Sequence, residues 1–191
     1  MKAVLVSIFT IGLFAGGYCQ DKPRAFEKGD FSVSLGYGIG NIWKGFLEDA
    51  ISFPDNYTVS SSGPYVLILD YNIHRRINIG IATGYSETKG DYKGSGQSFS
   101  EKLTAFSALF RANWHFGKWE KFDLYAGGGA GYYHFNYSNN RNIIKPNSVP
   151  GSFGYSLQLG TSYYFSKHVG LYGEVGYVGG SLAQLGLKAK F

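Results

Sequence analysis

The stretch Gln184-Leu185-Gly186-Leu187-Lys188-Ala189-Lys190-Phe191 closes the chain, with polar or small residues at most even positions and apolar residues at odd positions. Successive side chains of a β-strand point to opposite faces, so this segment has one apolar and one polar face. A strand of a membrane barrel has this pattern because one face meets hydrocarbon and the other faces the barrel interior. The stretch therefore predicts a membrane-spanning strand that ends in an aromatic residue.

Seven further segments upstream show the same period of two. In residues 30–40 every odd position from Phe31 to Ile39 is apolar, and every even position between them is serine or glycine. Val66 and Ile68 are apolar exceptions on the polar face of the second segment. No window keeps the apolar spacing of an amphipathic helix for more than two turns. The predicted strands are residues 30–40, 65–73, 77–86, 102–116, 122–135, 152–165, 169–178 and 182–191.

The connections between these segments alternate in length, and only the last hairpin, at residues 179–181, departs from the rule. Short periplasmic turns and long external loops, with an even number of strands, are the layout of an outer-membrane barrel. The sequence therefore predicts an all-β fold, an eight-stranded antiparallel up-and-down transmembrane β-barrel in a bacterial outer membrane, with periplasmic termini and extracellular long loops. The short connections are residues 74–76, 117–121 and 166–168, and the long ones are residues 41–63, 87–101 and 136–151.

A water-soluble barrel is the alternative, and it would place its apolar face inside. The chain has 28 glycines and 18% aromatic residues, and nearly every outward position of the scheme above holds a large apolar side chain. Eight strands enclose too narrow an interior for so many rings. The aromatics fit instead the two girdles of a membrane barrel. Those near the short turns are Trp114, Phe116, Trp119 and Phe165, and those near the long loops are Tyr37, Tyr85, Tyr132 and Tyr177.

The first residues read as a secretory signal. Lys2 precedes an apolar stretch over residues 3–17, which is too short to span a bilayer as a helix. Small residues before a cut after Cys19 fit signal cleavage, so we expect a cleaved signal peptide at residues 1–19 and an outer-membrane barrel domain at residues 20–191. A lipoprotein, with Cys19 acylated, is the alternative, although Tyr18 is not the small residue that such a site prefers.

Several kinds of chemistry find little support in the composition. Cys19 is the one cysteine, so the predicted mature chain has no disulfide, thiol nucleophile or thiolate metal site. The four histidines show no paired ligand spacing, and the glycine run at residues 127–131 lacks the spacing of a phosphate-binding loop. The net charge of +5 is scattered along the chain, which argues against nucleic acid as a partner. We expect no metal and no cofactor.

Three stretches carry a resemblance to a known family. Residues 124–132 (LYAGGGAGY), residues 170–177 (GLYGEVGY) and residues 185–191 (LGLKAKF) are similar to the small outer-membrane β-barrel domain family of the OmpX and opacity type. The resemblance implies an eight-stranded barrel that contacts outer-membrane lipid and is inserted by the barrel-assembly machinery. Its insertion signal would comprise Gln184, Gly186 and Phe191, and Ala189 stands where that signal usually has a larger apolar residue.

Charged side chains on the inward faces form a second candidate group. An unpaired charge inside a narrow barrel would be costly, so each needs a partner. We expect an internal network of ion pairs and hydrogen bonds that plugs the lumen, in preference to a proton or ion pathway, because eight strands leave no room for a channel. Glu174 is predicted to pair with Arg111 or Lys188. The predicted members are Asp70, Arg111, His115, Glu174 and Lys188.

The first long loop contains apolar residues that no predicted strand explains. Packing of the loop on itself over the barrel mouth is the favoured interpretation, because long ordered loops usually carry a small core of their own. A contact surface for a protein partner is the alternative. Its candidate residues are Trp43, Phe46, Phe53 and Tyr57.

Three functions remain after these steps. A structural or surface-interaction role, with loops displayed on a sealed barrel, fits the pattern best. Transport of small apolar solutes is the first alternative, and a lipid-modifying enzyme is the second. His134 and Ser138 lie near the predicted rim but lack a recognisable motif and a carboxylate partner, so we expect no enzyme and no catalytic residue.

Overall fold

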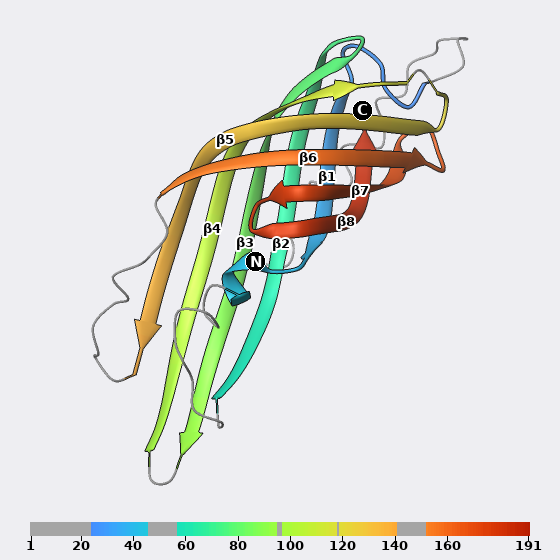
Figure 1. Ribbon diagram of the computed structural model, residues 1–191. Coiled ribbons are helices and arrows are strands. Elements are labelled where there is room, and N and C mark those ends of the chain that lie inside the picture. The colour runs from blue at the N-terminus through green and yellow to red at the C-terminus, as the bar shows by residue number, and fades with distance from the viewer. Residues whose placement is uncertain (1–23, 46–56, 95–96, 118, 141–151) are drawn as a thin grey trace, which may run out of the picture.

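Eight antiparallel strands close into a barrel in the computed structural model of the protein (Figure 1). The structure describes residues 24–45, 57–94, 97–117, 119–140 and 152–191, so the predicted signal peptide lies outside the described residues. The predicted fold class is confirmed. The strands are β1 (Phe31–Ile39), β2 (Tyr57–His74), β3 (Ile77–Gly94), β4 (Gln97–His115), β5 (Phe122–Asn139), β6 (Phe153–Tyr164), β7 (Val169–Val178) and β8 (Ser181–Lys190).

Each strand pairs with its neighbours in sequence, and β1 closes the barrel against β8. The apolar residues of the alternating pattern lie on the outer face of the barrel, and the polar and small residues lie on the inner face. In β6, for example, Leu157 is 64% exposed on the outside whereas Ser156 is 3% exposed on the inside. Val66 and Ile68, the two exceptions to the pattern in β2, are buried in the interior. Among the described residues, none forms a helix with the length and hydropathy needed to cross a membrane.

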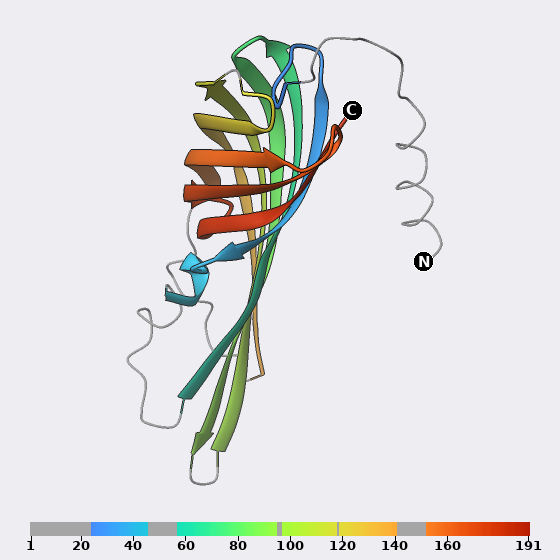
Figure 2. The ribbon, with the colours of Figure 1, turned by 90° about the vertical axis from the view of Figure 1, so that its right-hand side faces the viewer.

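Four strands are longer than predicted at their loop ends, β2 and β3 by eight residues each, β4 by five and β5 by four. β2 begins at Tyr57, and β3 and β4 each run nine residues past Tyr85 and Phe106, to Gly94 and Gln97. At the rise of a β-strand this adds roughly 30 Å. Figures 1 and 2 show β2 to β5 continuing as one sheet well beyond the ends of the other strands. Parts of the three predicted long loops are therefore strands. We call residues 57–64, 86–94, 97–105 and 133–139 the extension.

The polarity of the two faces reverses where the extension begins. We use "above" for the direction toward the tip of the extension, which points down in Figure 1. On β4, Phe106, Phe110 and Trp114 point outward at and below the start of the extension, whereas Lys102 and Thr104 point outward above it. The inner face of β4 changes from polar to apolar, because Arg111 and His115 point inward below this level and Leu103 and Ala105 point inward above it. A search for outward apolar residues therefore stops at the start of the extension, although the hydrogen-bonded ladder continues.

The chain before β1 lies against the opposite end of the barrel, which carries the short turns and both ends of the described chain. The amide of Ala25 donates to the carbonyl of Trp119 at 3.0 Å, and Lys190 Nζ donates to the carbonyl of Arg24 at 2.6 Å. Phe26 stacks on His115 with ring centroids 3.6 Å apart. This segment therefore covers the opening of the barrel at the short-turn end.

Candidate functional site

A buried ion pair lies at the centre of the barrel interior. Arg111 of β4 is 1% exposed and faces Glu174 of β7. Arg111 Nη2 donates to Glu174 Oε1 at 2.5 Å, and Arg111 Nη1 donates to Glu174 Oε2 at 3.2 Å. Two parallel bonds of this kind fix orientation as well as distance. One of the two pairings predicted for Glu174 is therefore present.

Neutral donors and a second carboxylate complete the surroundings of this pair. Tyr125 Oη donates to Glu174 Oε1 at 2.8 Å, and the amide of Gln184 donates to Glu174 Oε2. On the other side, Arg111 Nε lies 3.6 Å from Asp70 Oδ1. The carboxylate of Glu174 thus accepts from three different side chains, which offsets the cost of removing it from water.

A tier of amide side chains lies next to the ion pair. Arg111 Nη2 also donates to Asn113 Oδ1 at 3.3 Å. Asn113 donates to Asn78 Oδ1 at 2.8 Å and accepts from Gln158 Nε2 at 2.8 Å. These amides and Tyr125 were not among the predicted members of the network, although their inward positions in the alternation were a sufficient signal.

His115 belongs to a separate pair nearer the short-turn end. Its Nδ1 lies 2.8 Å from Asp123 Oδ1 and 3.0 Å from Asp123 Oδ2, and both residues are buried. Phe26 covers one face of the imidazole. Asp123 was missed because it follows directly on a turn, where an acidic residue is usually in solvent.

Lys188 is buried on the inner face of β8 but contacts the network differently from the prediction. Its Nζ lies 5.6 Å from the centroid of the Tyr125 ring, within the range of a cation–π interaction. Two cations, Arg111 and Lys188, thus share the middle of the lumen with two carboxylates, Asp70 and Glu174. The two positive and two negative charges balance, which reduces the cost of burying them.

Glycines make room for the tyrosine rings that fill the lumen. A Cβ atom on Gly160 would clash with the ring of Tyr125, and one on Gly154 would clash with the ring of Tyr133. The inward glycines therefore provide no free volume, because rings from the neighbouring strand occupy the space. The interior is packed with side chains at this level.

An apolar cluster lies above the polar network, at the start of the extension. Trp43, in a helical turn at residues 42–45, packs edge-on against Tyr133 and Phe135 with centroids 5.4 and 4.7 Å apart. The buried members are Trp43, Leu103, Ala105, Leu109 and Tyr133. The lumen is thus polar in its lower part and apolar above, whereas the sequence had predicted a polar lumen throughout.

Trp43 is 5% exposed, which supports the favoured interpretation that this part of the loop packs over the barrel mouth, whereas the alternative of a contact surface for a partner stays a prediction. Tyr57, another candidate, is half-buried at the start of β2. Burial and the nearby carboxylate of Glu101 raise the pKa of its hydroxyl. Phe46 and Phe53 lie outside the described residues.

The predicted insertion signal lies in the closing strand. Gln184 is buried within the network, and Gly186 pairs with Gly36 across the β1–β8 seam. Phe191 is half-exposed and exchanges two backbone hydrogen bonds with Phe31, at 2.8 and 3.0 Å. Recognition of these residues by the assembly machinery stays a prediction.

The residues considered for catalysis point away from the lumen. His134 and Ser138 both lie exposed on the outer face of β5. In the part of the chain that the structure describes, no three His, Cys, Asp or Glu side chains gather in a way that could hold a metal ion.

The barrel geometry agrees with a family model for the outer membrane protein beta-barrel domain, which matches residues 7–190. The chain belongs to this family. Its place is therefore the bacterial outer membrane, and its outward apolar band meets outer-membrane lipid. No curated protein matches the chain.

Solved structures of the same fold share little sequence with this member of the family. The solid-state NMR structure of the outer membrane protein AlkL in lipid bilayers is 14% identical, covers 92% of this chain and 96% of its own, and gives a TM-score of 0.50. OprG from Pseudomonas aeruginosa is 14% identical with a TM-score of 0.48, over 86% of this chain and 97% of its own. Ail of Yersinia pestis is 12% identical with a TM-score of 0.44, over 86% and 100%.

Proposed function

We propose that the protein is a sealed outer-membrane barrel with a structural or surface-interaction role, and that it displays the extension outside the cell. The observation that carries the proposal is the reversal of polarity at the level of Tyr85 and Phe106. Below it, residues 77–85 of β3 span nine residues with an apolar outer face, and a membrane strand needs about 9–11 residues. Above it, the outer face is polar and belongs in water.

The contents of the lumen support the sealed state. The Arg111–Glu174 pair and the amide tier fill the lower part, and the cluster around Trp43 fills the upper part. An eight-stranded barrel has space for side chains and no more. The proposed function therefore depends on the surface of the barrel and contains no catalytic step.

The orientation can be tested with single cysteines, because the predicted mature chain has none. Ser60 is exposed on the extension and Lys167 is exposed in a short turn. In intact cells a membrane-impermeant maleimide should label Ser60→Cys, whereas Lys167→Cys should react only after the outer membrane is permeabilised. The opposite pattern of labelling would show that the extension faces the periplasm and would overturn the proposal.

Transport of small apolar solutes is the second candidate function. The observation in its favour is that the inner face at the level of Trp43, Leu103 and Tyr133 is apolar, although a solute would have to displace these packed side chains. Such a path would have to leave through the wall, because the network blocks the axis.

Proteoliposomes separate a sealed barrel from an open one. In isosmotic arabinose, vesicles that contain the protein should swell no faster than protein-free vesicles, because the buried network occupies the lumen. Vesicles that contain a 16-stranded porin serve as the positive control. Swelling clearly above the protein-free rate would contradict the sealed lumen, because arabinose is polar and would have to pass along the barrel axis.

A further inference from the structure

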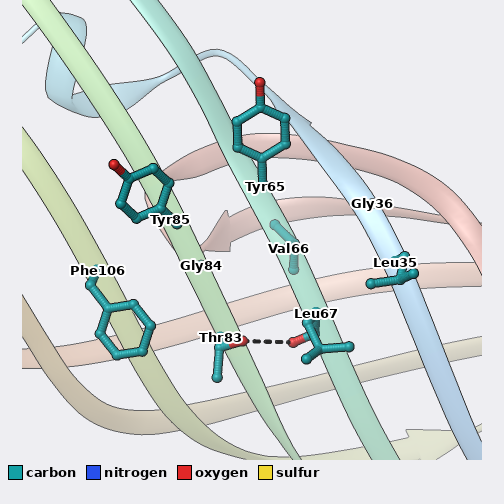
Figure 3. Close-up of a pocket in the computed structure, with 9 residues that line it drawn as sticks. All are labelled: Leu35, Gly36, Tyr65, Val66, Leu67, Thr83, Gly84, Tyr85 and Phe106. Atoms are coloured by element: carbon teal, nitrogen blue, oxygen red, sulfur yellow. Dashed lines mark hydrogen bonds between the residues drawn. The ribbon is translucent and has the colours of Figure 1, made fainter. Parts of the chain in front are cut away.

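A groove of about 370 Å³ opens on the outer surface of the barrel, directly below the extension (Figure 3). This volume lies within the range of about 300–1,000 Å³ of ordinary ligand pockets. Most of its lining side chains point away from the lumen and are exposed on the outer face. The lining residues are Leu35, Gly36, Tyr65, Val66, Leu67, Thr83, Gly84, Tyr85 and Phe106.

The groove arises from the register of β2, β3 and β4. Thr83 pairs with Leu67 on one side and with Ala108 on the other, so two small side chains stand next to each other on the outer face. The Thr83 hydroxyl donates to the carbonyl of Leu67 at 3.4 Å (Figure 3), which leaves its methyl group toward the membrane. Large side chains stand in the rows on either side of this dip. They are Tyr65, Tyr85 and Phe106 above it, and Leu69, Ile81 and Phe110 below it.

The upper edge of the groove marks the boundary between hydrocarbon and water. The hydroxyl of Tyr65 lies 2.9 Å from Ser62 Oγ, and the hydroxyl of Tyr85 donates to Glu87 Oε2 at 3.5 Å. Both tyrosines therefore hold their rings in the groove wall and their hydroxyls toward polar groups of the extension. This is the usual position of tyrosine in a membrane girdle.

Two lysines stand above that boundary on the same pair of strands. Lys89 and Lys102 are directly opposite each other in the β3–β4 register, four residues beyond Tyr85 and Phe106. At the rise of a β-strand this places them roughly 13 Å above the groove. Glu87 lies between them, with its Oε2 2.6 Å from Lys102 Nζ and its Oε1 3.0 Å from Lys89 Nζ.

Both ammonium groups of this lysine cluster contact the carboxylate of Glu87, and the exposed Asp91 stands two residues beyond Lys89 on the same face of β3. Hydrogen bonds from Lys102 and Lys89 lower the pKa of Glu87, and the bond to Glu87 raises the pKa of Lys102. The one carboxylate of Glu87 is thus shared between two ammonium groups. Exposed ion pairs of this kind are weak, so an incoming anion can displace Glu87 at small cost.

We propose that the groove and the two lysines together bind a phosphorylated lipid of the outer leaflet, with an acyl chain along Thr83 and a phosphate at Lys89 and Lys102. An acyl chain fits an apolar groove that opens only toward hydrocarbon. A phosphate fits a pair of lysines at headgroup height, since basic side chains near a membrane surface attract anionic lipid. The proposal rests on the orientation proposed above, which places the extension on the outer-leaflet side.

Titration of the purified, folded barrel in detergent with diphosphoryl lipid A, followed by native mass spectrometry, tests both parts of the site. Thr83→Phe should fill the groove and weaken binding about tenfold. The double variant Lys89→Ala/Lys102→Ala should weaken it at least about tenfold, taking roughly 1 kcal/mol for each lysine. Glu87→Gln removes the competing carboxylate and should tighten binding.

Matched controls separate the site from general effects. Thr161 of β6 also faces outward and donates to a backbone carbonyl across the strand, that of Asp123, at 3.0 Å, so Thr161→Phe should bind lipid A like the wild type. Lys167→Ala, at the short-turn end, should do the same. A heat-modifiable shift on unheated gels confirms that each variant is folded.

Three results would overturn the inference. They are equal binding by Thr83→Phe and Thr161→Phe, equal binding of lipid A and its dephosphorylated form, and weaker binding by Glu87→Gln. None of these readouts depends on which way the barrel faces in the cell. A failure of the lipid site can therefore be distinguished from a failure of the proposed orientation, which cysteine labelling measures separately.

Discussion

Replacing Arg111 with methionine should destabilise the folded barrel by about 3–5 kcal/mol, because removal of one partner of a buried ion pair leaves the other charge uncompensated. Glu174 would then keep only Tyr125 and Gln184 as donors, and it would share the lumen with the carboxylate of Asp70. Urea unfolding of the barrel in phospholipid vesicles, followed by tryptophan fluorescence, measures the loss.

The partner variant and the double variant sharpen this prediction. Glu174→Gln should cost less than Arg111→Met, because Arg111 keeps Asp70 at 3.6 Å. The double variant Arg111→Met/Glu174→Gln should recover part of the loss, since well-packed neutral side chains can replace a buried ion pair at little cost. A loss below about 1 kcal/mol for Arg111→Met would mean that water reaches the pair, and the lumen would then not be sealed.

The sequence predicted the strands correctly where apolar residues face the membrane and polar or small residues face the lumen. In β1 the odd residues from Phe31 to Ile39 meet the membrane side and the even residues meet the lumen, so alternation alone was sufficient. The part of the extension beyond the predicted strands was missed because its environment is reversed. On β3, Glu87 and Lys89 point outward and Thr88 points inward, and a segment with polar residues on its outer face resembles a loop when apolar residues are expected there.

The interior was predicted in kind but not in detail. Alternation placed Arg111, Lys188 and Glu174 on inward faces, and charge balance then required Glu174 to pair with one of the two cations. The choice between Arg111 and Lys188 as the partner of Glu174 could not be made, because it depends on the stagger of strands that are 63 residues apart in the chain. The same holds for Asn78, which meets Asn113 across 35 residues.

In both halves of the four long strands, the outer face matches its surroundings, which are hydrocarbon in one half and water in the other. Between the girdles the outside is hydrocarbon, so polar side chains collect inside and must satisfy one another. Above the boundary the outside is water, so apolar side chains collect inside and pack. The register of β2 against β3 shifts at Gly63–Pro64. As a result the odd-numbered residues of β2 point inward in the extension, whereas the even-numbered residues point inward in the membrane zone. Tyr57 and Val59 are half-buried on one side of the shift, and Val66 is buried on the other.

Trp43→Ala should lower the free energy of unfolding by about 3–5 kcal/mol, the usual cost of removing a large aromatic side chain from a packed core. The ring contacts Tyr133 and Phe135, and the surrounding strands are fixed by the barrel and cannot collapse into the space. Trp43→Phe keeps most of the apolar contact and should cost clearly less.

Trp119→Ala is the matched control, because Trp119 is half-exposed at the short-turn end, and it should change the free energy of unfolding by less than Trp43→Ala does. The comparison decides between two interpretations of the first loop. If Trp43→Ala and Trp119→Ala were equally mild, the indole of Trp43 would contribute little to the fold. The loop would then be free to leave the barrel mouth, and the contact surface that its apolar residues suggested would again be the better interpretation.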